Sequence, residues 1–141
     1  MFSKKRETNV LVVGAGPVGL FAALQLARQG IQVEVIDEQW RTAARSYALA
    51  LHPQSVALLG ELGLAEHLIA KGHKVHALAF YDLGQRRTVL EYSLLSSAHP
   101  YLLIVPQSEL EQLFEKGLEK AGVKVQWSHR VARLNTGTNG D

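Results

Sequence analysis

The first quarter of the chain alternates between short apolar runs and a segment with apolar residues at helical spacing. Residues 9–13 are mostly β-branched or aliphatic, which is typical of a strand that is buried on both faces. Leu20, Leu24 and Ala27 then share one face of a predicted helix. Residues 32–36 predict a second short strand. This order of strand, turn, helix and strand fits within about thirty residues, which is the length of a βαβ unit.

The remainder of the chain mixes extended segments with amphipathic helices. Extended structure is expected at residues 75–81, 88–92, 101–105, 123–127 and 131–134. Helices are expected after Pro53 and from Ser108, since Ser108 and Glu111 match the S-x-x-E capping box. Residues 39–51 show no clean period and predict a long connection. Together these elements predict an α/β fold that opens with a Rossmann-like βαβ unit.

A glycine-rich turn separates the first predicted strand from the first predicted helix. Gly14, Gly16 and Gly19 form the pattern G-x-G-x-x-G, with Pro17 and Val18 between the last two glycines. In this pattern the first glycine permits a tight turn, the second lets a pyrophosphate approach the backbone, and the third lets the helix pack closely on the strand. The free N–H groups of the first helical turn then face an anion. The turn therefore predicts a dinucleotide phosphate site.

Two acidic residues follow the second predicted strand. A carboxylate is needed there to accept hydrogen bonds from ribose hydroxyls, and Asp37 stands at that place with Glu38 beside it. No arginine is adjacent in the sequence, so the site is expected to disfavour the 2′-phosphate of NADP. From the residues alone FAD and NAD both stay open, because each presents an ADP ribose. The alternative is an ordinary glycine-containing turn with a solvated Asp37.

The amino-acid composition excludes several classes of protein for this chain. The 141 residues make one domain of ordinary size, and they include no cysteine, which excludes a disulfide framework, a thiolate metal site and a redox-active cysteine pair in this chain. We therefore expect a reducing, cytoplasmic setting. The positive excess of two charges disappears when the three basic residues at positions 4–6 are set aside, so we expect no nucleic-acid partner. The apolar residues 10–26 are too short and too interrupted to span a membrane.

Other candidate chemistry is weak. His73 and His76 lie three residues apart without a carboxylate or thiolate beside them, so we expect no metal site. No serine nucleophile turn or defensible pair of carboxylates is present either. We therefore assign no catalytic side chain to this chain.

Four segments resemble a known family. The residues VVGAGPVGL at 12–20 and VEVID at 33–37 look like the FAD-binding opening of class A flavoprotein monooxygenases, the para-hydroxybenzoate hydroxylase-like aromatic hydroxylases. Residues 51–64 resemble the family segment L-x-P-R-S-L-E-L-L…L-G-L, and residues 105–111 resemble its P-Q-x-x-L-E helix start. The resemblance extends from residue 9 to residue 134.

The resemblance implies a binding role for two further residues. The backbone around Gly16, Pro17 and Val18 would hold the FAD pyrophosphate, and Asp37, with Glu38 beside it, would bind the adenosine ribose. Val131 would offer its backbone to the adenine. Gln107 would contact the ribityl or phosphate region on the flavin side, although its position alone is that of an ordinary residue outside a capped helix.

One position departs from the family pattern. The family usually places an arginine six residues before the proline of the L-x-P segment, where this chain has Tyr47. Arg45 or Arg41 could reach the pyrophosphate instead, through a shift of the loop, and a solvated arginine is the alternative. Tyr47 could line the flavin or a substrate channel.

The implied protein is an FAD-dependent monooxygenase that hydroxylates a small aromatic or polyketide-like substrate with NAD(P)H and O₂, where NAD(P)H docks transiently. The family chain continues with a D-G strand motif, a substrate-covering sheet and a late G-D motif. We therefore expect residues 1–141 to be the N-terminal part of the FAD-binding domain, incomplete relative to the family fold and inactive by itself. The alternative is a non-catalytic nucleotide-binding module, or an inactive fragment that binds only the ADP moiety. A disulfide-reductase flavoprotein is disfavoured, because no cysteine pair is present.

Overall fold

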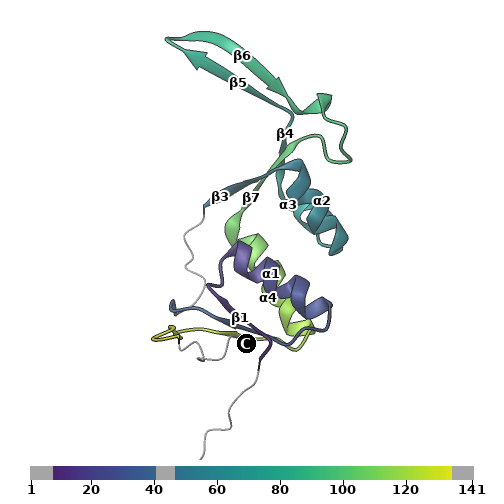
Figure 1. Ribbon diagram of the computed structural model, residues 1–141. Helices are drawn as coiled ribbons and strands as arrows, with labels where there is room; N and C mark the ends of the chain where they lie inside the picture. The colour runs from purple at the N-terminus through teal and green to yellow at the C-terminus, as the bar shows by residue number, and fades with distance from the viewer. Residues whose placement is uncertain (1–7, 41–46, 135–141) are drawn as a thin grey trace, which may run out of the picture. The chain divides into compact units, whose positions relative to one another are not determined.

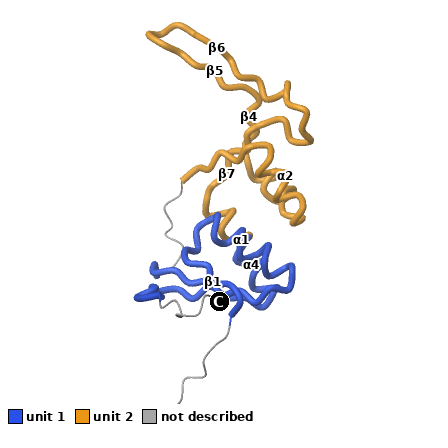
Figure 2. Tube along the Cα trace, in the orientation of Figure 1, with its two compact units in different colours: residues 1–44, 114–141 blue, residues 45–113 orange. Residues whose placement is uncertain are grey.

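The computed structural model describes residues 8–40 and 47–134. Their contacts group the chain into two compact units, which Figure 2 distinguishes by colour. Unit 1 contains residues 1–44 and 114–141, and unit 2 contains residues 45–113. The helix α4, Gln107–Lys120, therefore begins in unit 2 and ends in unit 1.

Unit 1 is built on a parallel sheet with the strand order β1–β2–β8 (Figure 1). Its elements are β1 (Val10–Val13), α1 (Pro17–Arg28), β2 (Val33–Ile36) and β8 (Val125–Gln126), with the second half of α4. The register pairs Val10 with Val33 and Val35 with Val125. Helix α1 connects the parallel strands β1 and β2, so the predicted βαβ unit is confirmed. Pro17 occupies the first helical turn, as its missing N–H allows.

The core of unit 1 lies between the sheet and two helices. Leu24 of α1, Val35 of β2, and Phe114 and Leu118 of α4 are almost completely buried. Burying a side chain of this size stabilises a fold by about 1.5–3 kcal/mol. Helices α1 and α4 approach closely because residue 117 is glycine, where a Cβ would lie 3.0 Å from a methyl carbon of Leu24. This packing holds α1 against the sheet and so fixes the turn that precedes the helix.

Unit 2 contains an antiparallel sheet with the order β3–β7–β4, covered by two short helices. Its elements are β3 (Ala48–Leu51), α2 (Pro53–Glu61), α3 (Ala65–Lys71), β4 (His73–Val75), β5 (Ala77–Asp82), β6 (Gln85–Glu91), the 3₁₀ helix η1 (Tyr92–Leu94) and β7 (Leu102–Pro106), with the start of α4. Val56, Leu59 and Leu68 from the helices are buried together with Leu103 and Val105 of β7. The helix predicted after Pro53 is thus confirmed as α2.

Strands β5 and β6 form a separate two-stranded hairpin (Figure 1). The pair Asp82 and Gln85 closes it, so only Leu83 and Gly84 make the turn. Both turn residues have positive φ angles, 46° and 78°. Two-residue hairpin turns of this kind require left-handed backbone at both central positions.

Two predicted segments differ from the observed structure. Residues 131–134 were expected to be extended as a strand, but they form none, and β8 is limited to Val125–Gln126. Within the predicted connection 39–51, Ala48–Leu51 forms β3, which pairs with β7. Both differences depend on whether a distant strand offers a free edge, and the local pattern of residues does not contain that information.

Candidate dinucleotide-binding site

Each of the three glycines in the turn is favoured for a different structural reason. Gly14 has a φ of +104°, in the region that favours glycine, and its N–H donates to the carbonyl of Ile36 at 2.9 Å. A Cβ on Gly19 would lie 2.0 Å from the carbonyl oxygen of Gly14, so no larger residue fits there. A Cβ on Gly16 would meet no atom within 4 Å. The space over Gly16 is therefore open, as the approach of a ligand to this backbone requires.

Asp37 is tied to the glycine turn. Its Oδ2 accepts a hydrogen bond from the backbone N–H of Ala15 at 2.6 Å, and its Oδ1 accepts one from the N–H of Gln39 at 2.8 Å. A carboxylate has about four acceptor positions, so each oxygen keeps capacity for a ligand hydroxyl. Glu38 is more exposed than the half-buried Asp37. Asp37 can therefore shape the turn and still bind a ribose.

A pocket of about 320 Å³ lies beside these groups. It is lined by Val13, Gly14, Asp37, Glu38, Gln39, His129, Arg130 and Val131. The segment after β8 is held against the segment after β2, because the N–H of Ser128 donates to Gln39 and that of His129 donates to Asp37, at 2.8 Å and 2.9 Å to the carbonyl oxygens. The pocket thus lies at the carboxyl ends of parallel strands, where open α/β sheets bind their ligands.

The structure brings several predicted site residues together. Gly14, Asp37, Glu38 and Val131 line one pocket, although residue 131 is far from the others in the sequence. Pro17 is half-buried and follows the turn directly, while the side chain of Val18 is exposed. A role for Val18 in binding would therefore use its backbone N–H at the start of the helix.

Arg130 is a pocket residue that the sequence reasoning missed. No arginine is adjacent to Asp37 and Glu38 in the sequence, but Arg130, from the segment after β8, lines the same pocket. The expectation that the site disfavours the 2′-phosphate of NADP stays a prediction. A signal was present in the chain: the family resemblance places Val131 at the adenine, and Arg130 is its immediate neighbour.

Gln107 lies in unit 2, where its surroundings are well defined. Its backbone N–H donates to the carbonyl of Tyr47 at 2.8 Å, and its side-chain Nε2 donates to Oε1 of Glu111 at 2.7 Å. The predicted S-x-x-E capping box, with Ser108 as the N-cap of the helix, was wrong. Helix α4 already begins at Gln107, so Ser108 lies inside the first turn, and Glu111 accepts from the Gln107 amide. Arg41 and Arg45 lie outside the described residues.

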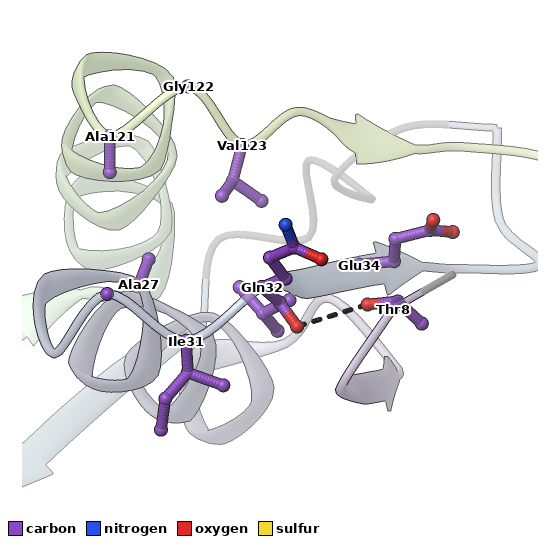
Figure 3. A pocket seen from close by; sticks show the side chains of 10 residues that line it. Thr8, Ala27, Ile31, Gln32, Glu34, Ala121, Gly122 and Val123 are labelled. Atoms are coloured by element: carbon purple, nitrogen blue, oxygen red, sulfur yellow. Dashed lines mark hydrogen bonds between the residues drawn. The ribbon is translucent and has the colours of Figure 1, made fainter. Parts of the chain in front are cut away.

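A second cavity, of about 550 Å³, lies at the opposite end of the parallel strands in unit 1 (Figure 3). Thr8 and Gln32, which precede β1 and β2, line it, and the Thr8 hydroxyl donates to the carbonyl of Gln32 at 3.1 Å. Gly30 and Gly122, which follow α1 and α4, close another side. This cavity faces the amino ends of the strands and the carboxyl ends of both helices. It therefore lacks the helix N-terminus that favours a phosphate.

Within residues 8–40 and 47–134, no group of three acidic, histidine or cysteine side chains is placed to hold a metal ion. No helix there is both long and apolar enough to cross a membrane.

The fold and the first pocket define an α/β domain that binds a dinucleotide. Residues 7–141 match a family described as FAD binding domain, and the chain belongs to this family. The open backbone over Gly16 fits the FAD pyrophosphate, and the remaining acceptor capacity of Asp37 fits the ribose hydroxyls.

Three relatives illustrate the similarity. The 6-methylpretetramide 4-monooxygenase of Streptomyces rimosus is 35% identical over 126 residues, which are 88% of this chain and 23% of that protein. The crystal structure of p-nitrophenol 4-monooxygenase PnpA from Pseudomonas putida DLL-E4 has a TM-score of 0.82 at 26% identity, over 91% of this chain and 33% of that one. The OxyS anhydrotetracycline hydroxylase structure from Streptomyces rimosus has a TM-score of 0.82 at 31% identity, over 94% of this chain and 26% of that one. The chain thus spans about a quarter to a third of the length of the relatives it matches.

Proposed function

We propose that this chain is the N-terminal FAD-binding part of a monooxygenase that hydroxylates a small aromatic or polyketide-like substrate with NAD(P)H and O₂. The observation that carries the proposal is the pocket that joins the glycine turn to Asp37, Glu38 and Val131. Aromatic and polyketide monooxygenases among the relatives support the substrate class. The cytoplasm is the compartment we expect.

The residues of this chain bind and orient the cofactor. We infer that the N–H groups at the start of α1 bind the pyrophosphate, that Asp37 binds the adenosine ribose, and that the backbone of Val131 contacts the adenine. When bound, FAD supplies the redox and oxygen chemistry, whereas the protein supplies position and electrostatics. No acid–base side chain from these residues is required.

A second function keeps the same pocket but no catalysis. In this alternative the chain is a nucleotide-binding module that recognises only the ADP moiety. The pocket residues all belong to unit 1, and they can bind adenosine and pyrophosphate without a flavin ring. The two functions therefore differ in whether the flavin half of FAD makes FAD bind more tightly than ADP.

Titration of the purified 141-residue chain with FAD and with ADP separates these functions. The monooxygenase proposal expects FAD to bind, ADP to compete with it, and the dissociation constant of FAD to be the lower of the two. Equal dissociation constants would favour the ADP module. A chain that binds neither ligand would contradict both functions.

A further inference from the structure

The cavity of about 550 Å³ at the amino ends of the parallel strands lies entirely within unit 1 (Figure 3). Its volume falls in the range of small-molecule pockets, about 300–1,000 Å³. The nucleotide pocket lies at the other end of the same strands, and the two share no lining residue. The cavity is thus a separate candidate site, which the proposed function leaves unused.

Two helices end at this cavity in the same way. Gly30, which follows α1, and Gly122, which follows α4, both have a φ of +79°. The residue after each glycine, Ile31 or Val123, donates its N–H to a helix carbonyl five residues back, at 3.1 Å and 2.9 Å. Each helix therefore ends in a Schellman cap. The carboxyl end of a helix carries about half a negative elementary charge, so both helices favour a cation in the cavity.

The polar side chains of the cavity add hydrogen-bond acceptors. The Thr8 hydroxyl directs its proton at the carbonyls of Gln32 and Val10, at 3.1 Å and 3.2 Å, so its oxygen keeps acceptor capacity for a ligand. Oε2 of Glu34 accepts a hydrogen bond from Nε2 of Gln126 at 3.2 Å, which leaves further acceptor positions on the carboxylate. Among the lining residues, all of which the structure describes, Glu34 is the only charged one.

The rest of the wall is mainly apolar. Four aliphatic side chains contribute to it: Ala27, Ile31, Val33 and Val123. The basic residues in the last turns of the two helices, Arg28 and Lys120, are exposed and do not line the cavity. A ligand that matches this wall therefore combines an apolar body with a cationic hydrogen-bond donor.

We propose that this cavity binds a small organic cation, in which an amidinium or ammonium group is carried on an apolar body. The cationic group donates to the carboxylate of Glu34 and the hydroxyl oxygen of Thr8, and the body contacts the aliphatic side chains. An anion is disfavoured, because it meets negative charge at Glu34 and at both helix ends. The inference does not depend on the proposed function, since no residue of the nucleotide pocket takes part.

The test uses benzamidine as the probe, with benzamide and benzoate as neutral and anionic compounds of similar shape. Isothermal titration of the 141-residue chain is expected to give benzamidine a dissociation constant roughly three- to tenfold below that of benzamide, as for a half-buried charged hydrogen bond. Benzoate should bind more weakly still. Saturating ADP should leave the dissociation constant of benzamidine unchanged, because the nucleotide pocket is at the other end of the strands.

Two variants test the cavity itself. Glu34→Gln keeps an acceptor for Gln126 but removes the charge, so benzamidine should bind it no better than benzamide does. Glu91→Gln, the same change in a strand of unit 2, is the matched control and should bind benzamidine like the wild type. Ala121→Leu fills the cavity from an exposed position, so it should weaken benzamidine and benzamide alike. If circular dichroism shows that Glu34→Gln does not fold, Ala121→Leu decides whether the probe occupies this cavity.

A further probe distinguishes a small molecule from an arginine of another protein. Acetylarginine amide represents such an arginine, and we expect it to bind more weakly than benzamidine, because its guanidinium group is carried on a flexible chain. Tighter binding of acetylarginine amide would overturn a small-molecule ligand.

The other outcomes also decide. Benzamide or benzoate that binds as well as benzamidine, equal benzamidine binding by Glu34→Gln or Ala121→Leu and the wild type, or displacement of benzamidine by ADP would each overturn the cation site. A wild-type chain that binds benzamidine but neither FAD nor ADP would overturn the proposed function alone.

Discussion

The carboxylate of Asp37 accepts a hydrogen bond from the backbone N–H of Ala15, with 2.6 Å between N and Oδ2. Ala15 lies inside the glycine turn, and Asp37 directly follows β2. One side chain thus connects the two segments that meet at the end of the parallel strands. Any substitution of Asp37 is expected to act on the turn as well as on a bound ribose.

Asp37→Ala is expected to weaken ADP binding by about tenfold or more, because it removes a hydrogen-bond acceptor of the ribose. It is also expected to lower the free energy of unfolding by about 1–3 kcal/mol, since the N–H groups of Ala15 and Gln39 lose their acceptor. Isothermal titration with ADP and urea unfolding measure the two effects separately. Asp82→Ala in β5 is the control and should leave ADP binding unchanged. An unchanged dissociation constant in Asp37→Ala would remove Asp37 from the ribose role.

Gly19→Ala and Gly16→Ala should separate packing from ligand binding. The Cβ of Gly19→Ala would collide with a backbone carbonyl, so we expect a loss of about 1–3 kcal/mol in the free energy of unfolding. Gly16→Ala meets no neighbour, and as an N-cap change it should cost about 0.5–1 kcal/mol or less while weakening FAD binding. Urea unfolding and FAD titration test both variants. Similar stability losses in the two would contradict this difference.

Arg130 is a cation that lines the same pocket as Asp37 and Glu38, so it can attract a phosphate on the 2′-position of the ribose. We therefore expect Arg130→Gln to weaken the binding of adenosine 2′,5′-bisphosphate more than the binding of ADP. The difference should be roughly threefold, because an exposed charge pair contributes less than about 1 kcal/mol. Competition titrations with the two nucleotides provide the measurement. Arg133→Gln, which does not line the pocket, is the control. If both nucleotides lose affinity equally, Arg130 does not act on the 2′-position.

Leu83→Asn is expected to stabilise the β5–β6 hairpin by about 0.5–1 kcal/mol, since a leucine with left-handed backbone is strained by about 1–2 kcal/mol and asparagine by less. Leu83 is 93% exposed, so the substitution removes little packing. Amide hydrogen exchange in β5 and β6 should slow in this variant. Leu94→Asn, at another exposed leucine, should leave the exchange of the hairpin unchanged. Faster exchange in Leu83→Asn would be evidence against strain at this turn.

The βαβ unit could be predicted because its signals are local. Pro17 at the helix start and Gly30 after the helix, where φ is +79°, mark boundaries within a few residues of the elements that they end. The apolar residues of β2 are buried, as their character predicts. The expectation that residues 9–13 are buried on both faces was wrong, because Leu11 and Val13 of β1 are exposed. The G-x-G-x-x-G spacing also predicted the position of the turn between β1 and α1.

Features that depend on distant segments could not be predicted in the same way. Residues of β3 form a strand because β7 offers an edge, and Arg130 reaches the pocket because the segment after β8 is bonded to that after β2. The role of Glu111 was misjudged for a related reason. The S-x-x-E pattern with Ser108 as the N-cap requires the helix to begin at Glu109, but the helix begins two residues earlier, and the Gln107 amide becomes the partner of Glu111.

The close seating of α1 on the glycine turn has a thermodynamic consequence for any ligand. The carbonyl of Gly14 has no room to move toward residue 19, and Asp37 holds the N–H of Ala15. The conformational entropy of this turn is therefore lost during folding, before a phosphate arrives. A preorganised turn of this kind lowers the entropic cost of association, so the affinity of the site depends on how well the rest of the fold keeps α1 in place.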